Sequence, residues 1–158
     1  MIKKLISGMR LDDLLNIFGK VVKTLCPYDR VDISILNRRT NHFDIPYILK
    51  GGQVTANTDE YSRPYASTVI SKVVEENRPL LRKDIRKDFQ FDTDRLFVEK
   101  GYATEMIFPL GIGTEVVGTF DIACFEPGRL TEKHMAILEE IMPAFSLAVF
   151  LFPMKKGA

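Results

Sequence analysis

The sequence has few of the features that mark metal sites, secretion or membrane insertion. Only two cysteines occur among its 158 residues, Cys26 and Cys124, and no Cys-x-x-Cys spacing is present. The apolar run near Ile141 is interrupted by Pro143 and Pro153 before it reaches the ~20 residues that a membrane span requires. The N-terminus lacks the apolar core of a signal peptide. We therefore expect reduced thiols, a cytoplasmic protein and no membrane insertion.

An excess of charge of either sign is also absent. The 22 basic and 21 acidic side chains nearly cancel, so no global field favours binding to nucleic acid. Hydrophobic residues make up 46% of a chain whose length suits one domain with a buried core. We interpret residues 1–10 as a lead-in, residues 11–150 as a single domain and residues 151–158 as a tail.

Hydrophobic periodicity predicts a helix and then a hairpin in the first third of the chain. Apolar residues recur at three- and four-residue steps over residues 11–25, which predicts an amphipathic helix that Pro27 ends. Residues 31–35 and 43–49 alternate between apolar and polar, which predicts two paired strands. Because Pro46 cannot donate to a ladder, we expect the second strand at a sheet edge.

The middle of the chain mixes loops with short elements. Residues 51–65 have loop composition, residues 65–77 predict a helix and residues 80–85 predict a strand. Residues 83–100 are rich in charge and aromatic rings, which indicates a loop with a helical turn near residues 93–99.

The last third predicts a hairpin followed by a long helix. Strands over residues 106–112 and 116–125 flank a glycine-rich turn, and Thr131 is a good N-cap for a helix that begins near Glu132. His134 stands where a capping box has Glu or Gln, so half of that motif is present. This order of elements predicts an α+β fold in which the terminal helices pack on one face of a mostly antiparallel sheet.

The last helix carries two apolar stripes, and Pro143 within it indicates a kink rather than a long straight coiled coil. One stripe comprises Met135, Leu138, Met142, Phe145, Val149 and Phe152, and the other Ile137, Ile141, Ala144, Ala148 and Leu151. One stripe is enough to cover a sheet, so the other needs the N-terminal helix or a second subunit as its partner. We predict a homodimer and take the first stripe as its candidate interface.

Several short segments, taken in order, resemble the GAF domain family over residues 11–149. They are residues 28–35, 66–70, 76–80, 84–85, 101–104, 109–110, 117–120 and 130–132. The resemblance implies a profilin-like, six-stranded antiparallel sheet with the terminal helices on one face and a ligand pocket on the other. It also implies a sensory or regulatory domain, often dimeric, that acts on an output domain of a larger signalling protein.

The ligand is not identified by this resemblance. The Asn-Lys-Phe-Asp-Glu signature of cyclic-nucleotide-binding members is absent, and neither cysteine has a context similar to a bilin-attachment site. The free methionine-sulfoxide reductases share the GAF fold, but they depend on loop cysteines that this chain does not reproduce. We therefore leave the cofactor unknown, expect no enzymatic activity, and expect His42 and His134 to be exposed rather than bound to metal.

Strand alternation sorts the candidate site residues by face. Val31, Ile33, Ile35, Phe120, Ile122 and Cys124 are expected to face the terminal helices. Candidate ligand-binding residues on the pocket side are Asp32, Ser34, Thr104, Thr119 and Asp121, and the resemblance places Tyr61, Arg63, Tyr65 and Ser67 in the pocket roof. A buried carboxylate is costly unless paired, so the two aspartates either orient a polar or cationic ligand or meet an Arg or backbone donors. The roof aromatics either line a small-molecule site or pack on the domain's own surface.

Three functions remain open at this point. The first is a non-enzymatic sensory domain that binds a small molecule and transmits the bound state through its terminal helices. The second is a ligand-free dimerisation module, whose pocket is filled by its own side chains. The third is a thiol-dependent enzyme of the sulfoxide-reductase type.

Overall fold

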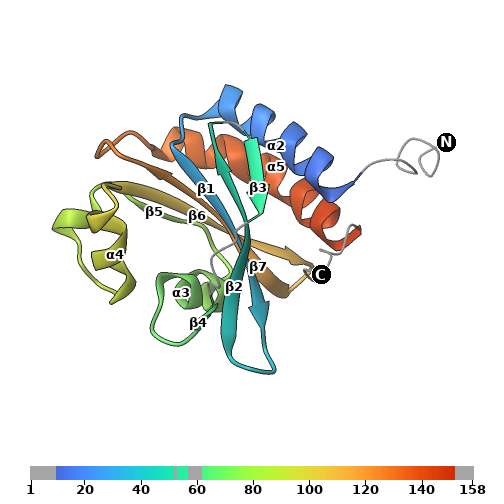
Figure 1. Ribbon diagram of the computed structural model, residues 1–158, viewed down its shortest axis with the longest axis horizontal. Coiled ribbons are helices and arrows are strands. Elements are labelled where there is room, and N and C mark those ends of the chain that lie inside the picture. Colours follow the sequence, from blue (N-terminus) through green and yellow to red (C-terminus); the bar gives the residue numbers. More distant parts are fainter. Residues whose placement is uncertain (1–9, 52, 57–61, 152–158) are drawn as a thin grey trace.

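The computed structural model describes residues 10–51, 53–56 and 62–151 (Figure 1). Its elements in chain order are α2 (Leu11–Leu25), β1 (Arg30–Asn37), β2 (His42–Lys50), β3 (Gln53–Ala56), β4 (Ser62–Pro64), α3 (Val69–Glu76), β5 (Leu80–Arg82), the 3-10 helix η1 (Ile85–Lys87), α4 (Thr93–Glu99), β6 (Thr104–Ile112), β7 (Glu115–Cys124) and α5 (Glu132–Leu151). No helix in this part of the chain is both long and apolar enough to cross a membrane.

The strands form one antiparallel sheet with the order β3-β2-β1-β7-β6-β5, and β4 pairs with the other end of β2. Helices α2 and α5 lie side by side over one face of this sheet, which we call the back face (Figure 1). Helices α3 and α4 lie over the opposite, front face. The predicted α+β fold, with both terminal helices on one face, is confirmed.

The back face holds the larger part of the core. Alternate residues of β1 and β7, such as Ile33 and Phe120, pack against α2 and α5, as strand alternation predicts. Phe145 of α5 contacts two other rings, Phe18 at 4.5 Å and Phe120 at 4.9 Å between centroids. These contacts join the terminal helices to the two central strands.

This packing corrects the predicted dimer interface. Leu138, Met142, Phe145 and Val149 are buried in the back-face core, and Met135 packs against it. They are the stripe that covers the sheet, so their side chains are not available to a second subunit. Phe152 lies outside the described residues.

The position of β2 differs from the prediction of an edge strand. Residues 42–44 pair with β4 and residues 47–50 pair with β3, so β2 has neighbours on both sides. Pro46 falls in the gap between β3 and β4, and the register with β1 is shifted there between Ile33 and Ile35. Pro46 is tolerated because neither β3 nor β4 pairs with it, so its missing N–H removes no hydrogen bond to these strands. The prediction that residues 51–65 form only a loop is wrong, because this segment contains the short strands β3 and β4.

Side-chain caps set the starts of the helices. Helix α3 begins later than predicted because Thr68 is its N-cap, with Oγ1 accepting from the Ser71 amide at 3.1 Å. In α5 the Thr131 amide donates to Nδ1 of His134 at 3.2 Å, and the His134 amide donates to Thr131 Oγ1 at 3.5 Å. His134 therefore completes the capping box that the sequence showed only in part.

Candidate functional site

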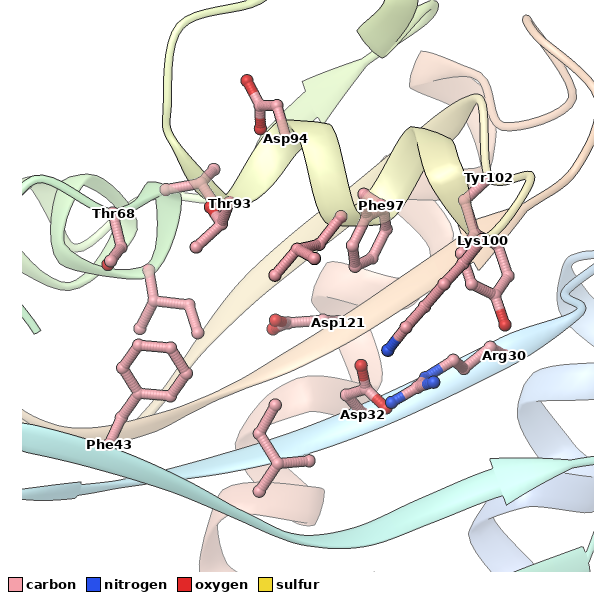
Figure 2. Close-up of a pocket in the computed structure, with 14 residues that line it drawn as sticks. Arg30, Asp32, Phe43, Thr68, Thr93, Asp94, Phe97, Lys100, Tyr102 and Asp121 are labelled. Carbon is pink, nitrogen blue, oxygen red and sulfur yellow. The ribbon is translucent and has the colours of Figure 1, made fainter. Parts of the chain in front are cut away.

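A cavity of ≈ 50 Å³ lies between the front face of the sheet and the helices α3 and α4 (Figure 2). Strands β1, β2 and β7 form its floor, and the first turn of α3 and one side of α4 form its roof. Its apolar walls are Phe43, Ile45, Val69, Ile70, Leu96 and Phe97. Among these walls a few polar side chains converge, which is the composition of small-molecule sites.

Two carboxylates lie on the cavity floor. Asp32 of β1 and Asp121 of β7 are directly opposite each other in the strand register, and Figure 2 shows both side chains on the cavity side of the sheet. The Arg30 Nε donates to Asp32 Oδ1 at 2.7 Å. Oδ1 of Asp121 is buried and has no hydrogen-bond partner among the described residues. The floor therefore holds one paired and one incompletely paired carboxylate.

Burial shifts the protonation of both groups. It raises the pKa of Asp121 well above its usual value; the Thr119 hydroxyl opposes this rise by hydrogen bonding, and the nearby carboxylate of Asp32 adds to it. Burial also raises the pKa of Asp32, although the ion pair with Arg30 opposes this shift. A cation brought to Asp121 would favour its ionised form, so protonation of this carboxyl and cation binding compete.

A buried cluster around Arg82 attaches the roof to the sheet. The Arg82 Nη1 donates to Asp94 Oδ1 at 2.7 Å and to Glu105 Oε1 at 2.8 Å, and its Nη2 donates to Asp94 Oδ2 at 2.7 Å. Asp94 Oδ2 also accepts from the amides of Gln90 and Phe91 at 2.9 and 3.0 Å. Asp94 lines the cavity from α4, whereas Arg82 and Glu105 belong to β5 and β6.

This cluster contains two carboxylates and one guanidinium. Burial raises the pKa of Glu105 to about 7, while Arg82 acts to lower it and Asp94 to raise it. Burial acts to raise the pKa of Asp94 too, but hydrogen bonds from Arg82 and from two backbone amides lower it overall. Asp94 is therefore the principal partner of Arg82, and Glu105 is the carboxyl that protonates first.

An aromatic stack closes the cavity where α4 ends. The Tyr102 ring lies 5.2 Å from Phe97, a wall residue, and stacks on Phe125 at 4.9 Å. Gly101, between α4 and this stack, has φ of +91°, a conformation that L side chains rarely adopt. The chain thus turns sharply from the roof into β6.

The predicted floor residues divide into two groups. Asp32 and Asp121 line the cavity. Ser34 and Thr119 are fully buried and hydrogen-bond to each other at 2.5 Å, and neither lines the cavity. Thr104 lies opposite Cys124 in the register, and its hydroxyl donates to the Arg82 carbonyl at 2.9 Å. The structure therefore brings together the two aspartates and gives the three hydroxyls structural partners.

The predicted roof residues lie away from the cavity. Tyr65 lines a separate cavity of ≈ 40 Å³ beside the β1–β2 turn, and its hydroxyl donates to the Ser71 carbonyl at 3.4 Å. Arg63 is on β4, opposite Phe43, and Ser67 is exposed. Tyr61 lies outside the described residues. Helix α3 begins after Arg63, Tyr65 and Ser67, which is why these three residues do not reach the cavity.

Helix α4 supplies the roof that the sequence did not predict. Five residues of α4 and its C-cap line the cavity: Asp94, and the set Thr93, Leu96, Phe97 and Lys100. Their spacing of three, four and seven residues from the first is that of one helix face, so the signal was present in the sequence. The sequence predicts one helical turn or more near residues 93–99 within a charged loop, without assigning a face of that helix to the pocket.

The described residues contain no group of three or more His, Cys, Asp or Glu side chains placed to hold a metal ion. Cys26 and Cys124 are both buried free thiols in the back-face core. Burial raises the pKa of Cys26 to about 12 and that of Cys124 to about 11, so neither thiol is prone to form a thiolate at neutral pH.

Comparison with known proteins agrees with this architecture. Solved structures with the same fold include the GAF domain of a two-component sensor histidine kinase from Bacillus halodurans, at 14% identity over 91% of this chain and 96% of that chain, with a TM-score of 0.75. A type II free methionine-R-sulfoxide reductase from Thermoplasma acidophilum matches at 17% identity over 91% and 97%, with a TM-score of 0.70. The GAF domain of a phosphoenolpyruvate-protein phosphotransferase from Coxiella burnetii matches at 16% identity over 95% and 89%, with a TM-score of 0.72.

At these identities the neighbours show a shared fold and leave activity open. No curated protein matches the sequence. The family profile described as GAF domain matches residues 11–149, which is most of the chain. The chain therefore belongs to the GAF domain family.

Proposed function

We propose that this chain is a non-enzymatic sensory or regulatory domain that binds a small molecule in the front-face cavity. The observation that carries the proposal is the buried, incompletely paired carboxylate of Asp121 inside a largely apolar cavity. Most buried polar atoms in native proteins have a partner, and exceptions gather at functional sites. A bound ligand gives this oxygen its partner.

The cavity volume of ≈ 50 Å³ suits a group of only a few heavy atoms. A larger ligand needs the roof to move outward. Helix α4 is the part of the roof able to do so, because its attachment to the sheet is concentrated in the Arg82–Asp94 pair and its C-terminal end leads into Gly101. A substantial minority of complexes show such a rearrangement of a segment on binding.

The central strands connect the cavity to the terminal helices. Asp32 and Asp121 alternate along β1 and β7 with Ile33 and Phe120, which pack against α2 and α5. A ligand on the front face therefore contacts strands whose other face supports both helices. Transmission requires that the ligand bind one packing of these helices more tightly than another. An output domain in a larger signalling protein would receive this difference.

The exposed side of the terminal helices favours a homodimer. Ile17 and Val21 of α2 are 51% and 41% exposed, and Ile137 and Leu147 of α5 are 40% and 52% exposed. Large apolar side chains gathered on two adjacent helices indicate an interface. Sedimentation equilibrium tests this directly: Leu147→Ser should shift the protein toward monomer, whereas Ile112→Ser, an exposed apolar residue of the β6–β7 hairpin, should not. A monomeric parent protein would contradict the dimer.

The same surface supports the second candidate, a dimerisation module without a ligand. The enzyme candidate is less well supported, because both cysteines are buried and their raised pKa values disfavour the thiolate. A thiol-dependent turnover assay on Cys26→Ser and Cys124→Ser separates it from the others. Activity that is lost in either variant would establish the enzyme instead.

Ligand binding itself is tested with a library of small cationic, neutral and anionic fragments. Each is titrated at millimolar concentration into the ¹⁵N-labelled protein while the amide resonances of cavity residues are followed. Saturable shifts at Val69, Phe97 and Tyr102 are expected for at least one fragment. If no fragment shifts them, the cavity is not a binding site and the dimerisation module becomes the better account.

A further inference from the structure

We infer that the front-face cavity selects a small molecule with a cationic nitrogen beside an apolar group, and that Asp121 binds this nitrogen. The inference rests on the proposed function, since it assigns ligand chemistry to the same cavity. It depends on which hydrogen bonds the cavity residues already make and which they leave unmade.

The cavity oxygens that lack a hydrogen bond can each accept one. Oδ1 of Asp121 and Oγ1 of Thr93 are both buried, line the cavity, and have no hydrogen-bond partner among the described residues. A carboxylate accepts only, and a hydroxyl accepts as well as donates. An ammonium carries three N–H donors, and the cavity offers it one acceptor on the floor and another in the roof.

The charges around Asp121 point to the same ligand. Asp32 lies directly opposite Asp121 and forms an ion pair with Arg30 at 2.7 Å, and the charge of Lys100 also acts to lower the pKa of Asp32. Asp94 is already saturated by Arg82 and two amides. Asp121 itself forms no ion pair with the described residues, so a ligand ammonium would be the partner that allows this buried carboxyl to ionise.

Lys100 is the competing cation within the protein. Figure 2 shows its side chain reaching toward Asp32, yet it forms no ion pair within the described part of the chain. Its backbone position at the C-terminal end of α4 leaves the side chain exposed. If Lys100 filled the role assigned to the ligand, added amines would not bind, and anions would bind at its ammonium.

The apolar walls define the remainder of the ligand. Phe43, Val69 and Phe97 surround the carboxylates and offer no further charge. A branched alkyl or small aromatic group next to the nitrogen would remove this surface from water. The burial that raises the pKa of Asp121 adds a linkage: binding of a cation favours the ionised carboxyl and releases up to one proton.

Three probes with the same branched alkyl body separate the head groups: isoamylamine, isoamyl alcohol and isovalerate. Each is titrated into the ¹⁵N-labelled full chain at pH 7, with amide shifts of the cavity residues as the readout. The amine is expected to bind at least tenfold more tightly than the alcohol, and isovalerate is expected to give no saturable shift.

Variants then assign the contact. Asp121→Asn keeps the side-chain volume, cannot ionise to pair with an ammonium, and should lower amine affinity at least tenfold while leaving alcohol affinity unchanged. Asp44→Asn removes an exposed carboxylate of β2 that does not line the cavity, and should change neither affinity. A thermal melt of each variant shows that it is folded.

The outcomes distinguish the inference from the proposed function. Equal affinity for the three probes, preference for isovalerate, or unchanged amine binding by Asp121→Asn overturns the ligand chemistry. If neutral or anionic fragments shift the cavity resonances and the amine does not, small-molecule binding stands and its cationic selectivity is wrong. If no probe or fragment shifts them, both are wrong.

Discussion

Replacing Glu105 with Gln should stabilise the folded protein above neutral pH and leave it unchanged in acid. Glu105 is buried and shares Arg82 with Asp94, so the cluster holds two carboxylates for one guanidinium. Gln keeps an acceptor oxygen within reach of Arg82 and makes the cluster neutral. Because Asp94 still pairs with Arg82 through both oxygens, the substitution does not leave a buried cation without a partner.

The magnitude follows from the shift in pKa. Burial raises the pKa of Glu105 from 4.5 to about 7 in the folded protein. Since the folded pKa is the higher one, the stability that Glu105 contributes is fully present below pH 4.5 and is lost as pH rises through 7. At 1.36 kcal/mol for each pKa unit, the wild-type protein loses about 3 kcal/mol relative to the Gln variant over this range.

Urea denaturation of both proteins at pH 4.5 and pH 8 measures this difference. The gain of about 3 kcal/mol is expected at pH 8 only. Glu115→Gln, on the exposed β6–β7 turn, is the control and should show no such pH-dependent gain. A loss of stability in Glu105→Gln at pH 8 would refute the reasoning, because it would mean that attraction to Arg82 outweighs the burial of the second carboxylate.

Three further substitutions test the fold around the site. Thr68→Ala removes the N-cap of α3 and should cost about 1 kcal/mol in urea denaturation, whereas Thr68→Ser should retain most of it. Gly118→Ala places a Cβ against the Ser34 carbonyl oxygen, so it should disrupt β1–β7 pairing and lower the melting temperature by several degrees; an unchanged melt would contradict this close approach. Arg82→Met leaves two buried carboxylates without their cation and should cost about 3–5 kcal/mol at pH 8, with a smaller loss at pH 4.5; equal losses at both pH values would contradict the electrostatic account.

Regular strands made the face assignments predictable. Along β1 and β7 the side-chain period of two is unbroken, so alternation alone placed Ile33 toward the helices and Asp32 and Asp121 toward the cavity. The terminal helices were likewise predictable from apolar spacing and from Thr131 as an N-cap. These features depend on neighbouring residues in the sequence and not on distant contacts, so the sequence is enough to predict them.

Features that depend on distant partners were not predictable. The polar segment around β4 pairs with β2 through only three residues, which leaves no alternation to detect. Pro46 indicated an edge strand because it lacks an N–H. The gap between β3 and β4 that accommodates it depends on long-range pairing, which the sequence does not show. The Arg82 cluster joins residues 12 and 23 positions apart, and nothing local to Arg82 shows that it will be buried.

In helix α5 the apolar stripes were predicted from the sequence, but the stripe assigned to a dimer interface packs against the sheet. Its two apolar stripes were evident, but sequence alone does not say which one faces the sheet. Leu138 and Phe145 belong to the stripe that packs against the sheet in the back-face core. Leu147 lies on the exposed side of the helix. Leu147 belongs to neither predicted stripe, and a partner surface on the exposed side of α5 stays a prediction.

The most direct test of the sensory role reads both faces of the sheet in one titration. A fragment that saturates the front-face cavity is added to the ¹⁵N-labelled protein, and the amide shifts of cavity residues are compared with those of Val22 in α2 and Phe145 in α5. The account predicts that both sets change along one binding curve. Cavity shifts that saturate while the α2 and α5 resonances stay fixed would contradict transmission through the terminal helices.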